Sequence, residues 1–340
     1  MKLFDFIQLF AVQTTLLNST GNDLSPEMKT YYDMRLLDYA QANLVHDQFG
    51  QKRPIPQNGG KTIEFRKFSP LGKALTPLTE GVTPAGNILD VTALTATVVQ
   101  YGDFIVQSDI LELTAIDNTI LEATKLLGRQ AGKTLDTVTR DILVAGTNVM
   151  YAPKINASTG AETAVSSRAN LDATAVLTVD LVEQVVANLR AMDAPTIDGY
   201  YIGIIHPFTA YDLMRDPDWR DPHKYVDTTN IYQGEIGQIG GVRFVQSTEA
   251  KIWTGTGCPA NLAVFGSLFF GEGAYGVTEV SGGGLQTIVK QKGSAGTADP
   301  LDQRSSVGWK ALKTAEILLP EYLIRVEHCC KRYSATAQAN

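Results

Sequence analysis

The segment between residues 61 and 107 constrains the fold most, because its pattern predicts a long two-stranded β-hairpin that projects from the rest of the chain. Residues 62–68 (TIEFRKF) alternate apolar and polar side chains, which is typical of a half-exposed strand. Residues 91–99 (VTALTATVV) are rich in residues that favour strands. The stretch between them is broken by prolines and glycines, namely Pro70, Gly72, Pro77, Gly81, Pro84 and Gly86. A hairpin alone is marginally stable in water. This one therefore needs a surface to lie on, which points to a partner subunit.

The strongest helical pattern follows this excursion. Apolar residues recur at three- and four-residue steps from Ile110 to Ile142. Thr119 and Glu122 form a capping box, so the long helix is predicted to start at Thr119. It is predicted to run to about residue 145, with Gly146 as its stop. At 1.5 Å per residue such a helix is on the order of 40 Å long, enough to act as a stiff spine.

The remaining chain predicts an arm followed by a compact α/β unit. Residues 1–50 read as an extended arm with one short helix, which starts at the signal Ser25-Pro26-Glu27. Further on, the patterns predict helices at 181–192 and 207–214, strands at 200–205, 241–245 and 262–265, and strand-like runs at 307–319 and 322–326 joined at Pro320.

Charge and cysteine content exclude several classes of protein. The 340 residues hold 29 Lys and Arg against 36 Asp and Glu, a net charge of −7, which argues against a protein that wraps DNA. Cys258, Cys329 and Cys330 are odd in number, and two of them are adjacent, so no disulfide framework is predicted and a reducing cytoplasm is indicated. No stretch reaches the roughly 20 apolar residues that span a bilayer. The N-terminal residues lack a signal-peptide cleavage site.

Two glycine motifs suggest nucleotide binding, and both fail on context. Residues 128–134 (GRQAGKT) resemble a phosphate-binding loop, but they have one residue too few between the glycines and lie inside the predicted long helix. Residues 271–276 (GEGAYG) match the dinucleotide fingerprint, but a strand-like stretch at 277–280 follows where a helix is required. We therefore predict structural roles for both segments and no cofactor.

The remaining polar clusters also carry no enzyme signature. The four histidines, His46, His206, His223 and His328, form no zinc-binding spacing, and His206 is expected to end a strand. A dense group of acidic and basic residues at 212–227 surrounds Trp219. Its paired carboxylates suit a divalent cation or acid–base work. We favour a loop held by ion pairs at solvent or at a subunit boundary, because both signs of charge are present. No catalytic or metal site is predicted.

Eight stretches in order resemble the major capsid proteins of tailed phages with the HK97-like fold, and specifically their N4-type family. They are LSPEMKTYYD (24–33), NLVHDQFG (43–50), GGKTIEF (59–65), PLTEG (77–81), LELTAIDN (111–118), IHP (205–207), GEIG (234–237) and DPLDQR (299–304). The resemblance spans residues 24–325, and its weight comes from the combination of stretches.

The resemblance implies an α+β fold with a fixed order of parts. These are an N-terminal arm at 1–55, an extended β-hairpin loop at 56–106, a peripheral domain with the spine helix at 107–175, an axial domain at 176–296, and peripheral return strands with a tail at 297–340. It also implies hexamers and pentamers in an icosahedral virion shell, made in the host bacterial cytoplasm. The implied partners are portal and decoration or scaffolding proteins, and double-stranded DNA that the shell contacts weakly.

Candidates for contacts between subunits lie on the hairpin and in the charged cluster. They are Lys61, Arg66, Lys67, Lys73, Glu80, Asp216, Trp219 and Arg220. Two alternatives stay open at this point. One is an encapsulin-like shell that encloses cargo protein, and the other is a soluble nucleotide-dependent enzyme, which rests only on the two defective glycine motifs.

Overall fold

The computed structural model divides the chain into two compact units. The first comprises residues 1–41, 102–130 and 286–310, and the second comprises residues 42–101, 131–285 and 311–340. The structure describes residues 36, 38–40, 44–54, 61–68, 71, 73–78, 80–83, 86–114, 119–156, 158–219, 235–278, 284–292 and 299–340. The helix expected after Ser25 lies outside these residues. The five-part division into arm, loop, peripheral and axial segments stays a prediction.

The first unit is built on a three-stranded sheet with the order β14-β15-β4. Its strands are β14 (Leu285–Lys290), β15 (Arg304–Lys313) and β4 (Val99–Ser108), followed by the short helix α2 (Asp109–Thr114). On β15 every second side chain is buried, including Val307 and Trp309. This alternation leaves the opposite face of the sheet exposed.

The long helix α3 (Thr119–Val144) lies against this sheet with its N-terminal residues. Gln130 Nε2 donates to Asp103 Oδ2 at 2.6 Å, and Trp309 Nε1 donates to Gln130 Oε1 at 3.4 Å. Gln107 Nε2 donates to the carbonyl of Thr119 at 3.0 Å, which fixes the start of the helix. The prediction that the long helix starts at Thr119 is thus confirmed, and the Thr119 hydroxyl donates to Gln107 Oε1 at 3.1 Å.

The arm enters the first unit through a close helix contact. Leu36 and Ala40 are fully buried, and a Cβ atom added to Gly128 would lie 2.9 Å from Cβ of Tyr39. Such an approach leaves no space for a side chain at position 128. The glycine that suggested a phosphate-binding loop therefore serves helix packing.

The second unit contains a seven-stranded sheet with the order β5-β17-β12-β8-β10-β9, and β11 pairs with β12. These strands are β5 (Val149–Tyr151), β17 (Leu323–His328), β12 (Val264–Phe270), β8 (Tyr201–Ile205), β10 (Val242–Gln246), β9 (Glu235–Ile239) and β11 (Ile252–Trp253). Strands β8 and β10 run parallel, whereas β12 is antiparallel to β8 and β17.

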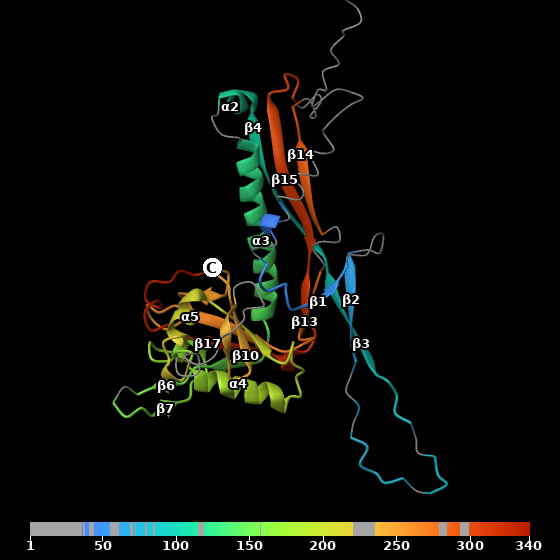
Figure 1. Ribbon diagram of the computed structural model, residues 1–340, viewed down its shortest axis with the longest axis vertical. Coiled ribbons are helices and arrows are strands. Elements are labelled where there is room, and N and C mark those ends of the chain that lie inside the picture. The colour runs from blue at the N-terminus through green and yellow to red at the C-terminus, as the bar shows by residue number, and fades with distance from the viewer. Residues whose placement is uncertain are drawn as a thin grey trace, which may run out of the picture. The chain divides into compact units, whose positions relative to one another are not determined.

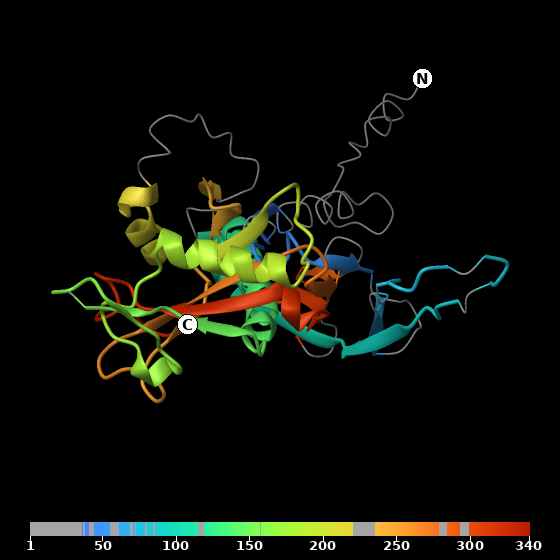
Figure 2. The same cartoon turned by 90° about the horizontal axis from the view of Figure 1, so that it is seen from below.

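Both faces of this sheet are buried, which explains the continuous apolar run in β8. On one face Tyr201 and Ile205 belong to the core formed with α4 (Val179–Ala191). On the other face Ile202 and Ile204 meet Leu143, near the end of α3. Figure 2 shows α4, in yellow-green, lying across the orange-red strand β17.

Polar side chains cap the N-termini of α4 and α5 (Pro207–Leu213). Thr178 Oγ1 accepts from the N–H of Leu181 at 3.3 Å, so it caps α4. His206 Nδ1 accepts from the N–H of Phe208 at 3.1 Å and caps α5. The expectation that His206 ends a strand is confirmed, because β8 stops one residue before it. Capping satisfies N–H groups that have no partner inside the helix.

The smaller elements of the second unit include the root of the predicted hairpin. A three-stranded sheet has the order β1-β13-β16, and two-stranded sheets pair β2 with β3 and β6 with β7. They are β1 (Gln51–Arg53), β13 (Tyr275–Thr278), β16 (Ala315–Ile317), β2 (Thr62–Phe68), β3 (Val91–Thr97), β6 (Lys154–Ile155) and β7 (Glu162–Thr163), with 3-10 turns at Arg168–Asn170 and Pro320–Tyr322. Figure 1 shows β2 and β3 leading into the long connection between them.

Candidate assembly surfaces

The root of the extended hairpin is fixed in the second unit by a small apolar core. Strands β2 and β3 pair antiparallel, with Ile63 opposite Ala96. Both residues are buried together with Phe65 and Leu318. A Cβ atom added to Gly276 would lie 2.3 Å from Cε1 of Phe65, so the ring lies directly on that glycine. The hairpin is therefore held at its base by packing within its own chain.

The tip of the same hairpin presents apolar side chains to solvent. The described residues between β2 and β3 form no helix or strand. The exposed apolar side chains, with exposed fractions from 61% to 89%, are Leu71, Leu75, Leu78, Val82, Ile88 and Leu89. Burying one such side chain fully contributes about 1.5–3 kcal/mol. A group of this kind marks a surface for another protein.

The charged hairpin residues predicted for contacts lie on accessible parts of the segment. Lys61, Lys73 and Glu80 are exposed, and Lys67 is half-buried. Arg66 Nε lies 3.1 Å from Glu64 Oε1 within the same strand, and both side chains are largely exposed. Exposed ion pairs contribute about 0–1 kcal/mol, so this one leaves Arg66 available to other groups. Their contacts with a neighbour stay predictions.

Trp219 is buried within its own chain, and its contact with a neighbouring subunit stays a prediction. Its side chain is 5% exposed and belongs to the core of the second unit. Its ring meets Phe244 edge-on, with 5.4 Å between ring centroids. A ring with so little free surface has almost nothing to offer a neighbour. The charged residues next to Trp219 in the sequence suggested an exposed position for it. The chain instead folds so that this side chain packs into the core.

Asp216 has an internal role as well. It is half-buried, and its Oδ2 accepts from the N–H of Val179 at 3.2 Å, at the first residue of α4. A carboxylate at a helix N-terminus is stabilising, because the free N–H groups there carry partial positive charge. Oδ1 accepts from the N–H of Asp218 at 3.1 Å. Arg220, the last candidate of this cluster, lies outside the described residues.

A buried charged network holds the segment that precedes the hairpin, and sequence reasoning missed it. His46 Nδ1 lies 2.8 Å from Asp136 Oδ2, and both side chains are fully buried. Next to it, Lys313 pairs with Asp47 in a buried ion pair, and Thr139 Oγ1 donates to Asp47 Oδ1 at 2.6 Å. The signal in the sequence that could have revealed this network is the adjacent pair His46 and Asp47, within the stretch 43–50 that resembles the capsid family. Buried charges need such partners, since an unpaired one is strongly destabilising.

The phenol of Tyr275 closes the same network. Its hydroxyl donates to the carbonyl of His46 at 2.5 Å. Burial raises the pKa of Tyr275 well above its ordinary value, and the nearby Asp47 and Asp136 carboxylates raise it further. The hydroxyl therefore stays a donor at every physiological pH. The segment 44–50 is thus held by contacts from α3, from Lys313 and from Tyr275.

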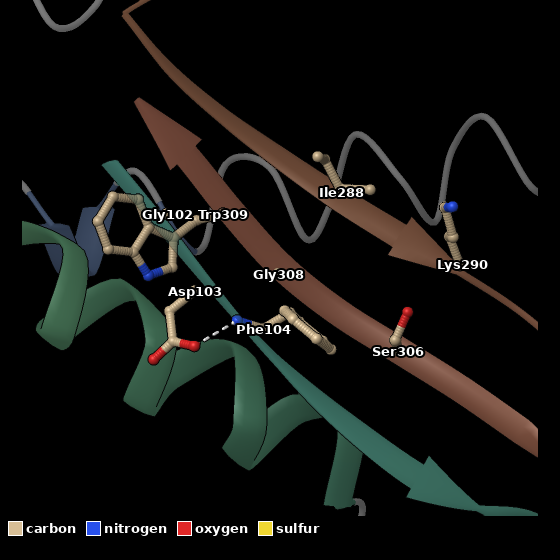
Figure 3. Close-up of a pocket in the computed structure, with 8 residues that line it drawn as sticks. All are labelled: Gly102, Asp103, Phe104, Ile288, Lys290, Ser306, Gly308 and Trp309. Carbon is tan, nitrogen blue, oxygen red and sulfur yellow. Dashed lines mark hydrogen bonds between the residues drawn. The ribbon is translucent and has the colours of Figure 1, made fainter. Parts of the chain in front are cut away.

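The exposed face of the sheet in the first unit is hollowed around Phe104 (Figure 3). The hollow has a volume of about 430 Å³, and its lining includes Gly102, Phe104, Ile288, Lys290 and Gly308. The two glycines bring β4 and β15 together, because a Cβ atom on Gly308 would lie 2.7 Å from Cβ of Phe104. Phe104 itself is 67% exposed. We call this feature the Phe104 hollow.

Asp103 also borders the hollow, but its carboxylate is engaged elsewhere. It accepts from Gln130 on α3, as described above, and from the N–H of Phe104 at 2.8 Å. The side-chain hydrogen bond from Gln130 and the backbone hydrogen bond from Phe104 lower the pKa of Asp103. This carboxylate thus fixes the sheet on the helix.

The segments that suggested nucleotide binding have structural surroundings. Residues 128–134 lie within α3, and residues 271–276 comprise the helix-free connection from β12 and the first two residues of β13. In the part of the chain that the structure describes, no three His, Cys, Asp or Glu side chains are grouped to hold a metal ion. Within that part, too, no helix is both long enough and apolar enough to cross a membrane.

Comparison with known proteins identifies the architecture. Residues 109–292, slightly more than half of the chain, match a family model described as phage capsid protein. The chain is similar to the capsid of Ralstonia phage GP4, with 13% identity, a TM-score of 0.63, and coverage of 81% of this chain and 85% of that one. Among curated proteins, none matches the sequence significantly.

Two further solved structures are similar. One is the capsid of Cyanophage P-SCSP1u, with 13% identity, a TM-score of 0.61, and coverage of 83% of this chain and 87% of that one. The other is a virus-like particle from Pyrococcus furiosus, with 11% identity, a TM-score of 0.50, and coverage of 88% and 99%. These similarities confirm the predicted α+β fold of the HK97-like type.

Proposed function

Since this chain belongs to the phage capsid protein family, we propose that it closes as hexamers and pentamers into an icosahedral phage head around double-stranded DNA. Its role is structural and non-catalytic, as a capsid subunit of the virion. The extended hairpin carries the proposal. Its root is fixed inside the chain, whereas its tip exposes six apolar side chains that only a neighbour would cover. Repeated head-to-tail contacts of this kind close into rings where the rotation between neighbours closes.

The finer assignments follow from the resemblance and from charge. The N4-type subfamily stays a prediction that rests on the eight stretches. Portal and decoration or scaffolding proteins are the proposed partners, and the host bacterial cytoplasm is the proposed site of synthesis. Three free cysteines support a reducing compartment. A net charge of −7 supports weak contact with the packaged DNA.

Removal of the hairpin tip tests the proposal. Phe68 pairs with Val91 at the end of the ladder, so a two-residue Asn-Gly turn can replace residues 69–90 and keep β2 and β3. We expect this variant to fold, because the root core of Ile63, Phe65 and Ala96 is retained. We expect it to form no closed particles by electron microscopy and analytical ultracentrifugation. Normal particles in normal yield would contradict the proposal.

A shell that encloses cargo protein is the second candidate, because the fold that this chain shares with a virus-like particle is compatible with either kind of shell. The two candidates differ in what the particle is built to hold. Particles formed by the chain alone are measured for diameter by electron microscopy. Large particles support the assignment as a phage head, whereas small empty particles of one uniform size support a shell that encloses cargo protein.

A further inference from the structure

A cationic patch built on Tyr211 lies beyond the C-terminal end of β8. Arg215 and Arg332 both lie over the Tyr211 ring, with their Cζ atoms 5.4 and 5.8 Å from the ring centroid. Arg215 Nη1 also donates to the Tyr211 hydroxyl at 2.8 Å. Both arginines are exposed, as is Lys331 next to Arg332. We call these four residues the Tyr211 patch.

Contacts between α5 and the C-terminal tail hold this patch in place. The N–H of Lys331 donates to Asp212 Oδ2 at 2.7 Å, which joins the tail to α5. The rings of Phe208 and Tyr333 stack with 4.1 Å between their centroids. An aromatic face orders a guanidinium group while the N–H groups at its edge can still donate. The patch is therefore preorganised to bind carboxylates.

A hollow of opposite character lies at the other end of the same sheet. Asp198 in the turn before β8 and Glu272 after β12 lie at this end, because β12 runs antiparallel to β8. Both carboxylates are exposed, and none of the described residues that line the hollow is basic. The hollow has a volume of about 480 Å³, and its lining also includes Gln48, Phe49 and Gln51. We call it the Asp198 hollow.

The placement of the two surfaces suits a contact between copies. Strand β17 runs in the same direction as β8, since both are antiparallel to β12, so the tail with Arg332 leaves the sheet at the end opposite to Asp198. The five residues of β8 alone separate these ends by roughly 17 Å at 3.4 Å per residue. One copy therefore cannot close its patch on its own hollow, whereas successive copies can join patch to hollow.

We propose that the Tyr211 patch of one copy docks on the Asp198 hollow of the next. Arg215 and Arg332 pair with the two carboxylates of the hollow, Asp198 and Glu272. This inference rests on the proposed function, since it names a contact that joins copies within a ring. Opposite charges at the two ends give the contact one direction and suppress the pairing of like ends.

DNA is a poorer occupant of the Tyr211 patch. The Asp212 carboxylate lies within the patch, where it accepts from Lys331. The surface therefore offers separate positions for single carboxylates, and it lacks the continuous positive charge that a phosphate backbone requires.

Charge reversals test the pairing. Glu272→Arg, Arg332→Glu and Arg215→Glu are made singly, and Glu272→Arg is also combined with each arginine reversal. The subunit concentration at which particles form is measured at low salt by light scattering and electron microscopy. Each single change is expected to raise that concentration about two- to fivefold, and one of the combinations to restore it. Asp198 is left unchanged, because its φ of 51° favours Asp or Asn.

Glu162→Lys, a reversal at an exposed residue of β7, is the matched control. It is expected to leave the assembly concentration unchanged, and it should not be able to rescue Arg332→Glu. Circular dichroism of the unassembled subunits checks that each variant is folded.

Chemical cross-linking tests the same contact by distance. Glu272→Cys combined with Arg332→Cys is made in a Cys258→Ser background, because Cys258 is not buried whereas Cys329 and Cys330 are. Assembled particles treated with a short bis-maleimide are expected to give a ladder of multimers on a denaturing gel. Glu272→Cys combined with Glu162→Cys is the matched control without a ladder. Absence of the ladder, or a link closed within one chain, would contradict the proposal.

The outcomes separate this proposal from the proposed function. Single reversals without effect, or combinations no better than the singles, would overturn the pairing. If removal of residues 69–90 still prevents assembly in that case, copies join through other surfaces and the proposed function stands. An Arg332→Glu variant that assembles normally but packages less DNA would identify DNA as the occupant of the patch, which also overturns the pairing.

Discussion

At the scale of single residues, several groups that looked functional in the sequence stabilise the second unit. His206 caps α5, and His328 is fully buried, with Ser267 Oγ 2.9 Å from its Nε2 and the Cys329 carbonyl 3.1 Å from its Nδ1. That carbonyl can only accept, so Nδ1 carries the hydrogen and Nε2 accepts from Ser267. Both imidazoles are therefore held as neutral groups, and the Ser267 hydroxyl that contacts His328 is itself buried.

The two histidines predict an acid-sensitive fold. Burial lowers the pKa of His206 and of His328 to about 4, from an ordinary 6.5, although Glu249 near His206 acts in the opposite direction. Between pH 6.5 and 4 the unfolded chain binds protons that the folded chain does not. The free energy of unfolding should therefore fall with decreasing pH, by up to about 1.4 kcal/mol per pH unit for each histidine. Urea denaturation at pH 7, 5.5 and 4.5 measures this slope.

A variant isolates the histidine contribution from that of the carboxylates. His328→Gln removes the titrating group and keeps a polar side chain next to Ser267. The variant is expected to be less stable at pH 7 but to lose less stability on acidification. A slope equal to that of the original chain would show that His328 does not cause the acid sensitivity.

Trp219 gives a prediction on stability at the same scale. Trp219→Ala should lower the free energy of unfolding by about 3–5 kcal/mol, because it leaves a cavity beside Phe244 in the core. Trp219→Phe, the matched control, should cost clearly less. Urea denaturation of the isolated subunit measures both. An alanine variant that is as stable as the original chain but fails to assemble would return Trp219 to the contacts between subunits.

At the scale of elements, the buried ion pair of Asp47 and Lys313 connects the segment before the hairpin to the end of β15. Lys313→Ala should lower the free energy of unfolding by about 3–5 kcal/mol, because it leaves the Asp47 carboxylate buried without its cation. The double variant Asp47→Leu with Lys313→Met should be much closer to the original chain. Chemical denaturation tests this, and a double variant less stable than Lys313→Ala would contradict it.

Elements with strong periodicity were predictable, and contacts between distant segments were not. The capping pair at Thr119 and Glu122 located α3 correctly, and the strand of residues 62–68 matches β2. Gly128 was misleading as a motif, since its role depends on Tyr39, which approaches from elsewhere in the chain. The ion pair of Asp47 and Lys313 joins residues 266 apart in sequence, and no local pattern reports such a pairing.

The candidate surfaces could likewise be predicted from the sequence only where they depend on local patterns. The sequence placed the hairpin and its need for a partner, because proline, glycine and strand patterns are local signals. The Phe104 hollow could not be predicted, since it requires β4, β14 and β15 to lie side by side in one sheet. Trp219 was predicted outside because its sequence neighbours are charged. The turn after α5 that carries it into the core is a tertiary feature.

At the scale of the whole molecule, the low charge content is consistent with a subunit that covers much of its surface with copies of itself. Charged residues make up 19% of the chain, below the average of about 25% for soluble domains. The net charge of −7 repels a DNA backbone. Under the proposed function, a head built from such subunits would hold its genome by enclosure, and the DNA would stay free to move during filling and release.

The exposed hairpin tip also has a kinetic consequence. Under the proposed function, a subunit that is packed at the hairpin root but uncovered at the tip is most vulnerable while it is alone, because its exposed leucines have no neighbour to cover them. Shell growth then competes with precipitation for the same side chains, and both accelerate as subunits accumulate. The rate at which an infected cell supplies subunits would thus determine whether they become heads or aggregates.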